Sequence, residues 1–514
     1  MRFTAFFGQF RRHFANGRRV LQASRAGALA PDFAPSASLR SPLSPGQKEP
    51  PRGRGRRIGG SRMTRWAYGV CVLALVASAA LADTPSPVTL TALRGLAPAT
   101  ALANTEAGRA ALAANFSVTG GVQTGEIRQP TLMPFAQQQQ QALRDAFIAF
   151  HNLTNLADGL GTTLGAAYQA RAHYLDRTRF TSVSGPVADA INYAESVALS
   201  DAGAGKFFFA NGTLDGKTPA PTEAQAILQD VKGAPDPFGR AYNRPAGSPG
   251  ADRYGNSRPF QTEPIQSPIV GPDYFNMPAS NSVYNRGPVM NLVDSPSYPS
   301  GHSTYGFTGA ILLAVLVPER YSQMIARGAE YGNDRIILGA HYAMDVMSGR
   351  TLATWEMAHL LANDPAFMNR PIRAGAPLGD FRATLAVARA DLTAALEAGC
   401  GDKFAACARQ DIGRFGDAAA VGSFYAATQT YGLPAVHPEM ADTQEDVGAL
   451  APEAGNLLTS AFPKLSLDEA DRILTETEGP GAGFLDDGSA FGVYSRLNLY
   501  EAGRRAAALS HDKP

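Results

Sequence analysis

Three short segments of this chain concentrate side chains that can bind an anion and transfer a proton. They are Arg253–Pro259, Tyr298–His302 and Asn333–Asp345. Together they hold arginines, two histidines, two aspartates and a glycine beside a serine. These are the residue types that bind a multiply charged anion and attack it with an imidazole nitrogen.

The second segment reads Pro-Ser-Gly-His and stands directly before a long apolar run. This order places Ser300 near a helix N-cap and Gly301 where a backbone can approach a ligand closely. The free N–H groups of a helix start, with the positive end of the helix dipole, form an anion site. His302 lies at the edge of that site, where it can donate a proton.

In the third segment, His341 and Asp345 are four residues apart, so on a helix they share one face. A carboxylate that accepts from one imidazole nitrogen fixes the tautomer and leaves the other nitrogen free for attack. Arg258 and Arg335 each offer a planar fork to the oxygens of a phosphate. Each segment alone is also typical of ordinary structure, but their conjunction in this order is rare.

The three segments resemble the signature of the type 2 phosphatidic acid phosphatase superfamily, over roughly residues 138–365. That signature reads Lys-x6-Arg-Pro, then Pro-Ser-Gly-His, then Ser-Arg-x5-His-x3-Asp. The superfamily includes bacterial class A nonspecific acid phosphatases and vanadium haloperoxidases. Tyr298–Val317 is most similar to the acid phosphatases.

The resemblance implies a metal-independent acid phosphatase that hydrolyses small phosphomonoesters through a phosphohistidine and needs no cofactor. His341 would be the nucleophile, Asp345 would orient it, and His302 would be the general acid. The phosphoryl oxygens would be held by a further set of groups: Arg258, Arg335, Ser300 and the Gly301 backbone. The remaining histidines have no metal-ligand spacing, and no metal site is expected.

The chain departs from the signature seven residues before Arg258, where Ala251 replaces the expected lysine. Arg253 is the nearest basic residue, and we predict that it binds phosphate in place of the lysine. Lys232 and Arg240 are the next candidates. The segment is expected to be non-helical, which would allow an irregular turn to bring two guanidinium groups to one pocket.

A second departure is Asp334, which replaces a serine and affects only a supporting hydrogen bond. Two other functions stay open. A vanadium haloperoxidase would hold vanadate in the same pocket as its cofactor, whereas a phosphatase would be inhibited by it. A phosphate-binding envelope protein whose catalysis has lapsed would explain the missing lysine.

The elements that position these residues are predicted to be all-α, a helical bundle with long ordered loops. Phe307–Val317 is almost purely apolar and has the length of a buried helix. The apolar spacing from Leu143 to Leu160 predicts an amphipathic helix, and another is expected from Ile336 to His359. Residues 210–300 are rich in Pro, Gly, Asn and Asp, which is typical of loops that carry binding groups.

The N-terminus divides into a basic stretch and a predicted export signal. Residues 1–62 contain twelve Arg and one Lys against two acidic residues, and we interpret them as a non-native or disordered extension. Residues 63–82 have the pattern of a signal peptide. Residues 83–376 then form the phosphatase domain and 377–514 a helical and loop extension of unknown role.

A periplasmic or secreted location follows from this signal. With the basic stretch removed the chain is mildly acidic, so no nucleic-acid partner is expected. No integral membrane segment is expected in the mature chain, and its oligomeric state stays open. Cys71 would leave with the signal, and the glycines beside Cys400 should break its helix and allow a small disulfide loop with Cys407.

Overall fold

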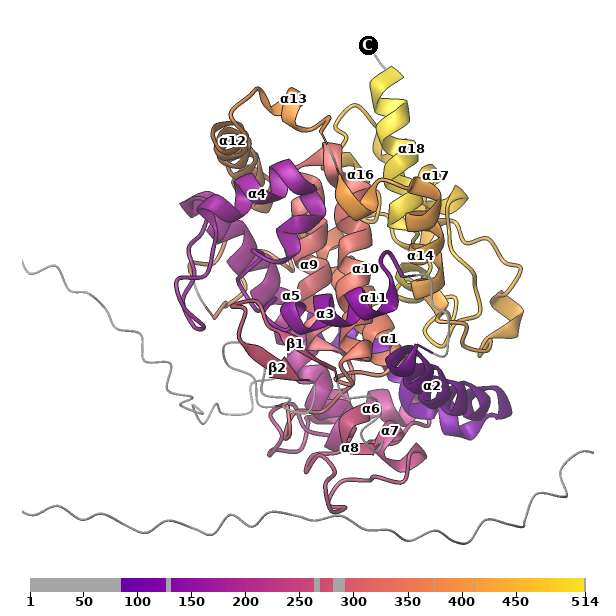
Figure 1. Cartoon of the computed structure of the whole chain (residues 1–514). Helices are drawn as coiled ribbons and strands as arrows, with labels where there is room; N and C mark the ends of the chain where they lie inside the picture. The colour runs from indigo at the N-terminus through magenta and orange to yellow at the C-terminus, as the bar shows by residue number, and fades with distance from the viewer. Residues whose placement is uncertain are drawn as a thin grey trace, which may run out of the picture. The chain divides into compact units, whose positions relative to one another are not determined.

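The computed structural model describes residues 85–125, 131–262, 269–280, 292–373, 375–410 and 412–512. In these ranges the fold is helical apart from one small antiparallel sheet, which confirms the all-α prediction. The elements, drawn in Figure 1, are α1 (Pro87–Leu96), α2 (Glu106–Thr124), α3 (Phe135–Asp145), α4 (Thr162–Arg171), α5 (Gly185–Asn211), α6 (Thr222–Asp230), α7 (Pro237–Ala241), α8 (Pro259–Thr262), β1 (Val270–Pro272), β2 (Pro278–Ser280), α9 (Gly301–Leu316), α10 (Tyr321–Ile337), α11 (Ala343–Leu361), α12 (Phe381–Cys400), α13 (Phe404–Cys407), α14 (Ala418–Thr430), α15 (Val447–Leu450), α16 (Asn456–Thr459), α17 (Leu467–Glu476) and α18 (Leu499–Asp512).

Helix α9 is the central element of this fold. Every one of its residues is buried, and α5, α10 and α11 pack around it (Figure 1). The helix contains the apolar run that the sequence predicted to be buried, and it ends just before Pro318, which cannot donate a backbone hydrogen bond. Because α9 is enclosed on all sides, its N-terminus is held in a fixed position.

The continuous helix predicted from Ile336 to His359 is wrong. Helix α10 ends at Ile337, and Gly339 then adopts a left-handed backbone with φ of 73°. The next helix, α11, begins at Ala343. His341 therefore lies in the connection and does not share a helix face with Asp345, which stands in the first turn of α11.

The helix predicted between Leu143 and Leu160 is also wrong beyond its start. Helix α3 ends at Asp145, and the Asn155 side chain donates to the carbonyl of Arg144 at 2.9 Å. His151 has a positive φ of 68°, which no α-helix accommodates. Apolar spacing in this stretch reflects burial of a folded-back loop.

The C-terminal helices α12 to α18 share the core of the domain that holds α9. One continuous cluster of buried apolar side chains runs from Val88 to Ala506. Helix α12 ends as predicted at Cys400, with Gly401 at a φ of 77°, and a disulfide joins Cys400 to Cys407. The boundary after residue 376 stays a prediction.

Two further expectations concern the chain ends and membranes. The predicted extension and signal peptide, residues 1–82, lie outside the described residues. Among the helices that are described, none has the length and apolarity that crossing a bilayer requires.

Candidate active site

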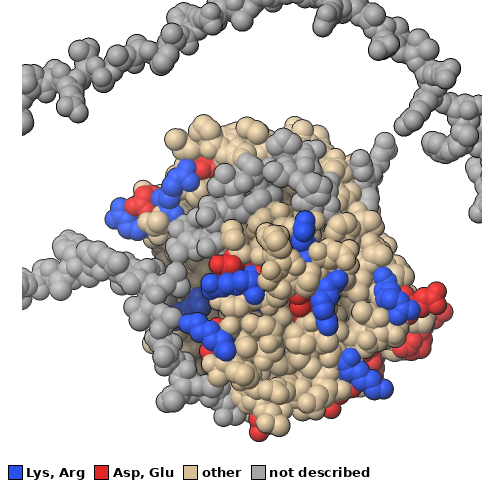
Figure 2. All heavy atoms as spheres, turned by 90° about the horizontal axis from the view of Figure 1, so that it is seen from below, with Lys and Arg blue, Asp and Glu red and all other residues tan. Residues whose placement is uncertain are grey.

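The three segments meet at one end of the helical core. The short helices α6 to α8 and their loops lie at that end, the lower one in Figure 1. The segment before α9 is joined to this loop region by a backbone hydrogen bond from Ser297 to Asn256. Figure 2 views this end directly and shows Lys and Arg side chains on the face, with basic atoms also recessed in a hollow.

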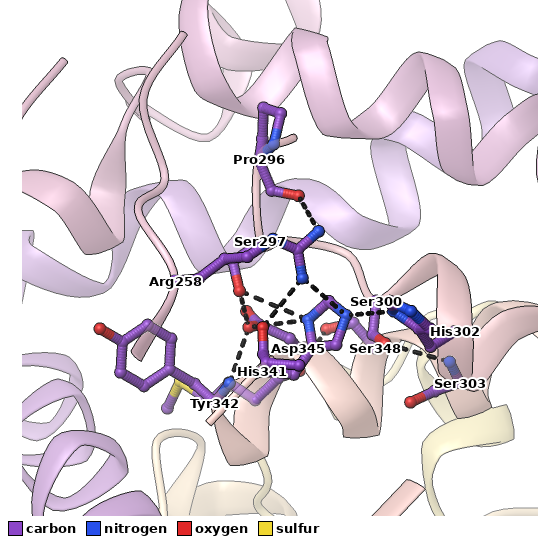
Figure 3. Close-up of polar contacts among 12 residues, drawn as sticks. Arg258, Pro296, Ser297, Ser300, His302, Ser303, His341, Tyr342, Asp345 and Ser348 are labelled. Carbon is purple, nitrogen blue, oxygen red and sulfur yellow. Dashed lines mark hydrogen bonds and ion pairs between the residues drawn. The ribbon is translucent and has the colours of Figure 1, made fainter. Parts of the chain in front are cut away.

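His341 lies at the centre of the cluster, as Figure 3 shows. Its Nε2 atom is 2.9 Å from Nδ1 of His302 and 3.1 Å from Nη1 of Arg258. Its Nδ1 atom is 3.4 Å from Oδ2 of Asp345. All four side chains are buried. The His302 ring and the Arg258 guanidinium therefore both point at Nε2.

Asp345 holds the imidazole from the opposite side. Its Oδ2 accepts the N–H of Tyr342 at 2.8 Å and the hydroxyl of Ser297. Burial raises the pKa of Asp345 to about 6, against the opposing effect of these two hydrogen bonds and of Arg258. The carboxylate caps α11 and orients His341 at the same time. Its 3.4 Å contact is long, as is common before substrate tightens a site.

The two arginines of the cluster donate to carbonyl oxygens. Arg258 bonds the carbonyls of Ser295 at 2.7 Å and Ala340 at 2.9 Å. Desolvation lowers its pKa to about 10. Arg335 donates to the carbonyl of Ala142 at 3.2 Å, and its Nε has no partner among the described residues. Neither arginine forms an ion pair with a carboxylate of the described residues, although Asp345 and Asp252 attract Arg258 at longer range.

The start of α9 has the form that the sequence predicts. Ser300 is the N-cap, and its hydroxyl accepts the N–H of Ser303 at 3.0 Å. The first N–H groups of a helix have no carbonyl within it, so those of Gly301 and His302 can donate to an anion.

Charge in the cluster acts strongly on both histidines. The pKa of His341 is lowered well below its ordinary value by desolvation, then by Arg258 and His302. That of His302 is lowered by desolvation, then by Arg335 and Arg258. A neutral His341 is the form that can attack. A bound dianion would offset the arginines and favour the protonated form of His302.

Arg253 is the one predicted site residue that the structure does not bring to the cluster. Its segment is irregular as expected, with Gly255 at a φ of 108°. However, its side chain is 63% exposed, lies over the Tyr254 ring and faces Asp294 at 3.8 Å. The turn therefore directs the Arg253 guanidinium towards Asp294 and the Arg258 guanidinium towards His341.

The alternatives to Arg253 are engaged elsewhere. Arg240 donates to the carbonyls of Asp236 and Ala234, beside its own short helix. Lys232 follows the C-cap of α6, and its backbone carbonyl accepts from the Asn104 side chain at 2.9 Å. None of these contacts involves the cluster.

Three residues near His341 were missed by the sequence argument. Ser297 bonds Asp345, Ser295 bonds Arg258, and Lys206 of α5 bonds the carbonyl of Pro296 at 2.8 Å. A signal for Lys206 was present: it is the single charged residue in the run Ala202–Ala210. Ser295 and Ser297 carried none.

Asp334 faces away from the cluster. Its carboxylate accepts from the Gln138 side chain at 2.7 Å, and burial beside Asp145 and Glu330 raises its pKa well above the ordinary value. It therefore takes no part in binding at His341. In the described part of the chain, no group of three or more His, Cys, Asp or Glu side chains is arranged to hold a metal ion.

The sequence of this region is similar to those of known proteins. Residues 249–364 match the PAP2 superfamily. An acid phosphatase of Zymomonas mobilis is 44% identical over 64 residues, 12% of this chain and 24% of that protein. Non-specific acid phosphatases of Salmonella typhimurium (40% over 84 residues, 16% and 33%) and Providencia stuartii (38% over 79 residues, 15% and 32%) are also similar. The matches thus span a quarter to a third of these relatives.

Proposed function

We propose that this chain, which contains a PAP2 superfamily domain, hydrolyses phosphomonoesters through a phosphohistidine on His341. The observation that carries the proposal is the position of His341 Nε2. It lies between His302 and Arg258, while Asp345 holds the other ring nitrogen.

In the first step the Nε2 lone pair of His341 attacks phosphorus. A P–N bond forms and the P–O bond to the leaving group breaks, while protonated His302 gives its proton to the leaving oxygen. Arg258 exchanges its contact with Nε2 for one with a phosphoryl oxygen, and His302 exchanges its own for one with the leaving oxygen. The product is the free alcohol and phosphorylated His341.

In the second step water attacks the phosphohistidine, and the now neutral His302 accepts its proton. The P–N bond breaks, inorganic phosphate leaves and both histidines return to their starting forms. The net reaction consumes one ester and one water. Arg258, Arg335 and the first N–H groups of α9 stabilise the charge on the phosphoryl oxygens, so the proposed chemistry needs no metal ion.

The test is hydrolysis of p-nitrophenyl phosphate by the purified protein. We expect turnover that survives exhaustive EDTA treatment and falls by about 10⁴-fold or more in His341→Ala. His173→Ala, which removes an exposed histidine, is the matched control and should be near wild type. Wild-type kcat/KM in His341→Ala would overturn the proposal, and loss on chelation that zinc or magnesium restores would overturn its metal independence.

We also propose export to the periplasm or the medium. The signal-like pattern of residues 63–82 supports it, as does the Cys400–Cys407 disulfide, because disulfides persist in oxidising compartments. N-terminal sequencing of the protein from fractionated cells should find a start near Asp83. An intact N-terminus in the cytoplasmic fraction would contradict export.

A further inference from the structure

Lys206 and Arg258 converge on the same two acceptors next to His341. The Lys206 ammonium donates to the Pro296 carbonyl at 2.8 Å and lies 3.5 Å from the Ser295 hydroxyl. Nη2 of Arg258 bonds the same hydroxyl at 3.2 Å and the same carbonyl at 3.3 Å. Figure 3 shows Arg258 between Pro296 and His341. Two cations on shared neutral acceptors repel each other, and an anion between them would relieve that repulsion.

The path of the Lys206 side chain leads over the start of α9. Its Cε atom lies 3.3 Å from the point where a Cβ on Gly301 would stand. The absence of a side chain at Gly301 therefore admits the lysine stem as well as a ligand. This brings the ammonium to the helix start whose N–H groups can donate to an anion.

The charges around Lys206 leave it without a direct counterion. No carboxylate of the described residues forms an ion pair with it, although Asp345 and Asp252 attract it at longer range. Desolvation, then Arg258, lower its pKa well below the ordinary value, and Lys206 in turn lowers the pKa of His302 and His341. The residue as a whole is only partly buried, but its ammonium is desolvated, so a ligand would meet it inside the pocket and not at the surface.

We propose that Lys206 is the third cation of the pocket around His341 and binds a phosphoryl oxygen together with Arg258 and Arg335. From helix α5, Lys206 would supply the positive charge that the family signature places at position 251, in the loop before Arg258. The inference rests on the proposed phosphatase function and replaces the prediction that Arg253 has this role.

The first test compares uncharged variants of matched positions. Lys206→Met should lower kcat/KM for p-nitrophenyl phosphate by about 10²-fold, the scale of losing one transition-state donor. It should also weaken competitive inhibition by inorganic phosphate by about tenfold, and Lys206→Arg should restore part of both. Arg253→Met and Lys217→Met, which remove exposed cations, should stay within about threefold of wild type.

These readouts separate ligand binding from a structural role. If Lys206 only supported the fold, Lys206→Met would lower Tm and the active fraction but leave the phosphate inhibition constant unchanged. Near-normal kinetics in Lys206→Met while His341→Ala is inactive would overturn this inference and leave the phosphatase proposal standing. Activity in His341→Ala would overturn the phosphatase proposal itself.

A structure of the unaltered protein with bound inorganic phosphate gives a test independent of any variant. The Lys206 ammonium should lie within about 3 Å of a phosphate oxygen, the distance of a charge-assisted hydrogen bond. Retention of its contact with the Pro296 carbonyl, with phosphate bound to Arg258 and Arg335 alone, would overturn the inference.

Discussion

Two regions of this protein bury arginines, and they do so in opposite ways. The Arg327 network joins α10 to α3 and to two turns, and it consists of Arg327, Asp145, Asp158, Glu330 and Arg414. The anion pocket consists of Lys206, Arg258, His302, Arg335 and His341. In the network, Arg327 forms two parallel hydrogen bonds of 2.7 Å to Asp145. In the pocket, Arg258 bonds carbonyl oxygens, a serine hydroxyl and an imidazole.

The pKa values of Arg327 and Arg258 are shifted in opposite directions. Burial alone would lower the pKa of Arg327, but Asp145, Asp158 and Glu330 raise it well above the ordinary value. Burial also raises the pKa of Asp145, yet Arg327 lowers it overall. Arg258 forms no ion pair with a carboxylate of the described residues; Asp345 and Asp252 attract it only at longer range, and desolvation lowers its pKa to about 10. A buried arginine satisfied by carboxylates stabilises the fold, whereas one satisfied only by neutral groups is available to an anion.

The Arg327 network should show the largest effect on stability. Arg327→Met leaves Asp145 buried and unpaired, so we expect a loss of about 3–5 kcal/mol in the free energy of unfolding. Activity per folded molecule should be nearly unchanged. Chemical denaturation measures the first quantity and active-site titration the second. Unaltered stability would contradict the claim that the Arg327 network stabilises the fold.

Arg258→Met is the matched change in the pocket. It should lower kcat/KM by about 10²–10³-fold, because a donor to the phosphoryl oxygens is lost. Stability should stay level or rise, since the removed cation has no carboxylate partner. A stability loss like that of Arg327→Met with little kinetic change would show that Arg258 is structural.

The role of His302 predicts an effect that depends on the substrate. His302→Ala should slow phenyl phosphate hydrolysis by about 10²-fold or more, because the leaving oxygen loses its proton donor. Dinitrophenyl phosphate, whose leaving group needs no proton, should recover most of this loss. Steady-state kinetics on both substrates decides the point. An equal loss on the two would contradict general-acid catalysis.

Replacement of Asp345 has the smallest expected effect, and it should raise the free energy of unfolding where Arg327→Met lowers it. Its pKa is raised from 3.8 to about 6 in the folded protein, so its ionisation begins to oppose folding above about pH 4 and opposes it fully above about pH 6. The full shift corresponds to about 3 kcal/mol. Asp345→Asn should therefore stabilise the protein at pH 7.5 by about 1–2 kcal/mol, less than the full amount because the neutral amide accepts weaker hydrogen bonds from Ser297 and Tyr342, while activity falls. The stability gain should vanish below about pH 4, where the carboxyl is neutral in both states. Thermal melts at the two pH values test this, and destabilisation at pH 7.5 would contradict it.

The sequence predicted the parts of the site that local chemistry determines. Short spacings in the sequence predicted the Ser300 cap, the first N–H groups of α9 and the proximity of Asp345 to His341, and the structure has all three. Gly339 ended α10 early, so the proximity arises from a connection and not from a helix face. The four-residue spacing predicted the contact between His341 and Asp345, but not the backbone geometry that brings them together.

The part that could not be predicted depends on tertiary packing. Lys206 and Pro296 are far apart in the sequence, and only the packing of α5 against α9 brings them together. Likewise, the direction of Arg253 depends on the turn at Gly255 and on the Tyr254 ring. The long apolar spacing after Leu143 indicated burial but did not distinguish a helix from a folded loop.

The central claim is that the pocket transfers a phosphoryl group to His341, and rapid-quench trapping tests it most directly. Protein mixed with ³²P-labelled p-nitrophenyl phosphate and quenched in base within milliseconds should carry an acid-labile, base-stable label. Peptide mapping should locate that label on His341, and His341→Ala should carry none. Turnover without any trapped phosphoprotein, or a label on another residue, would contradict the account.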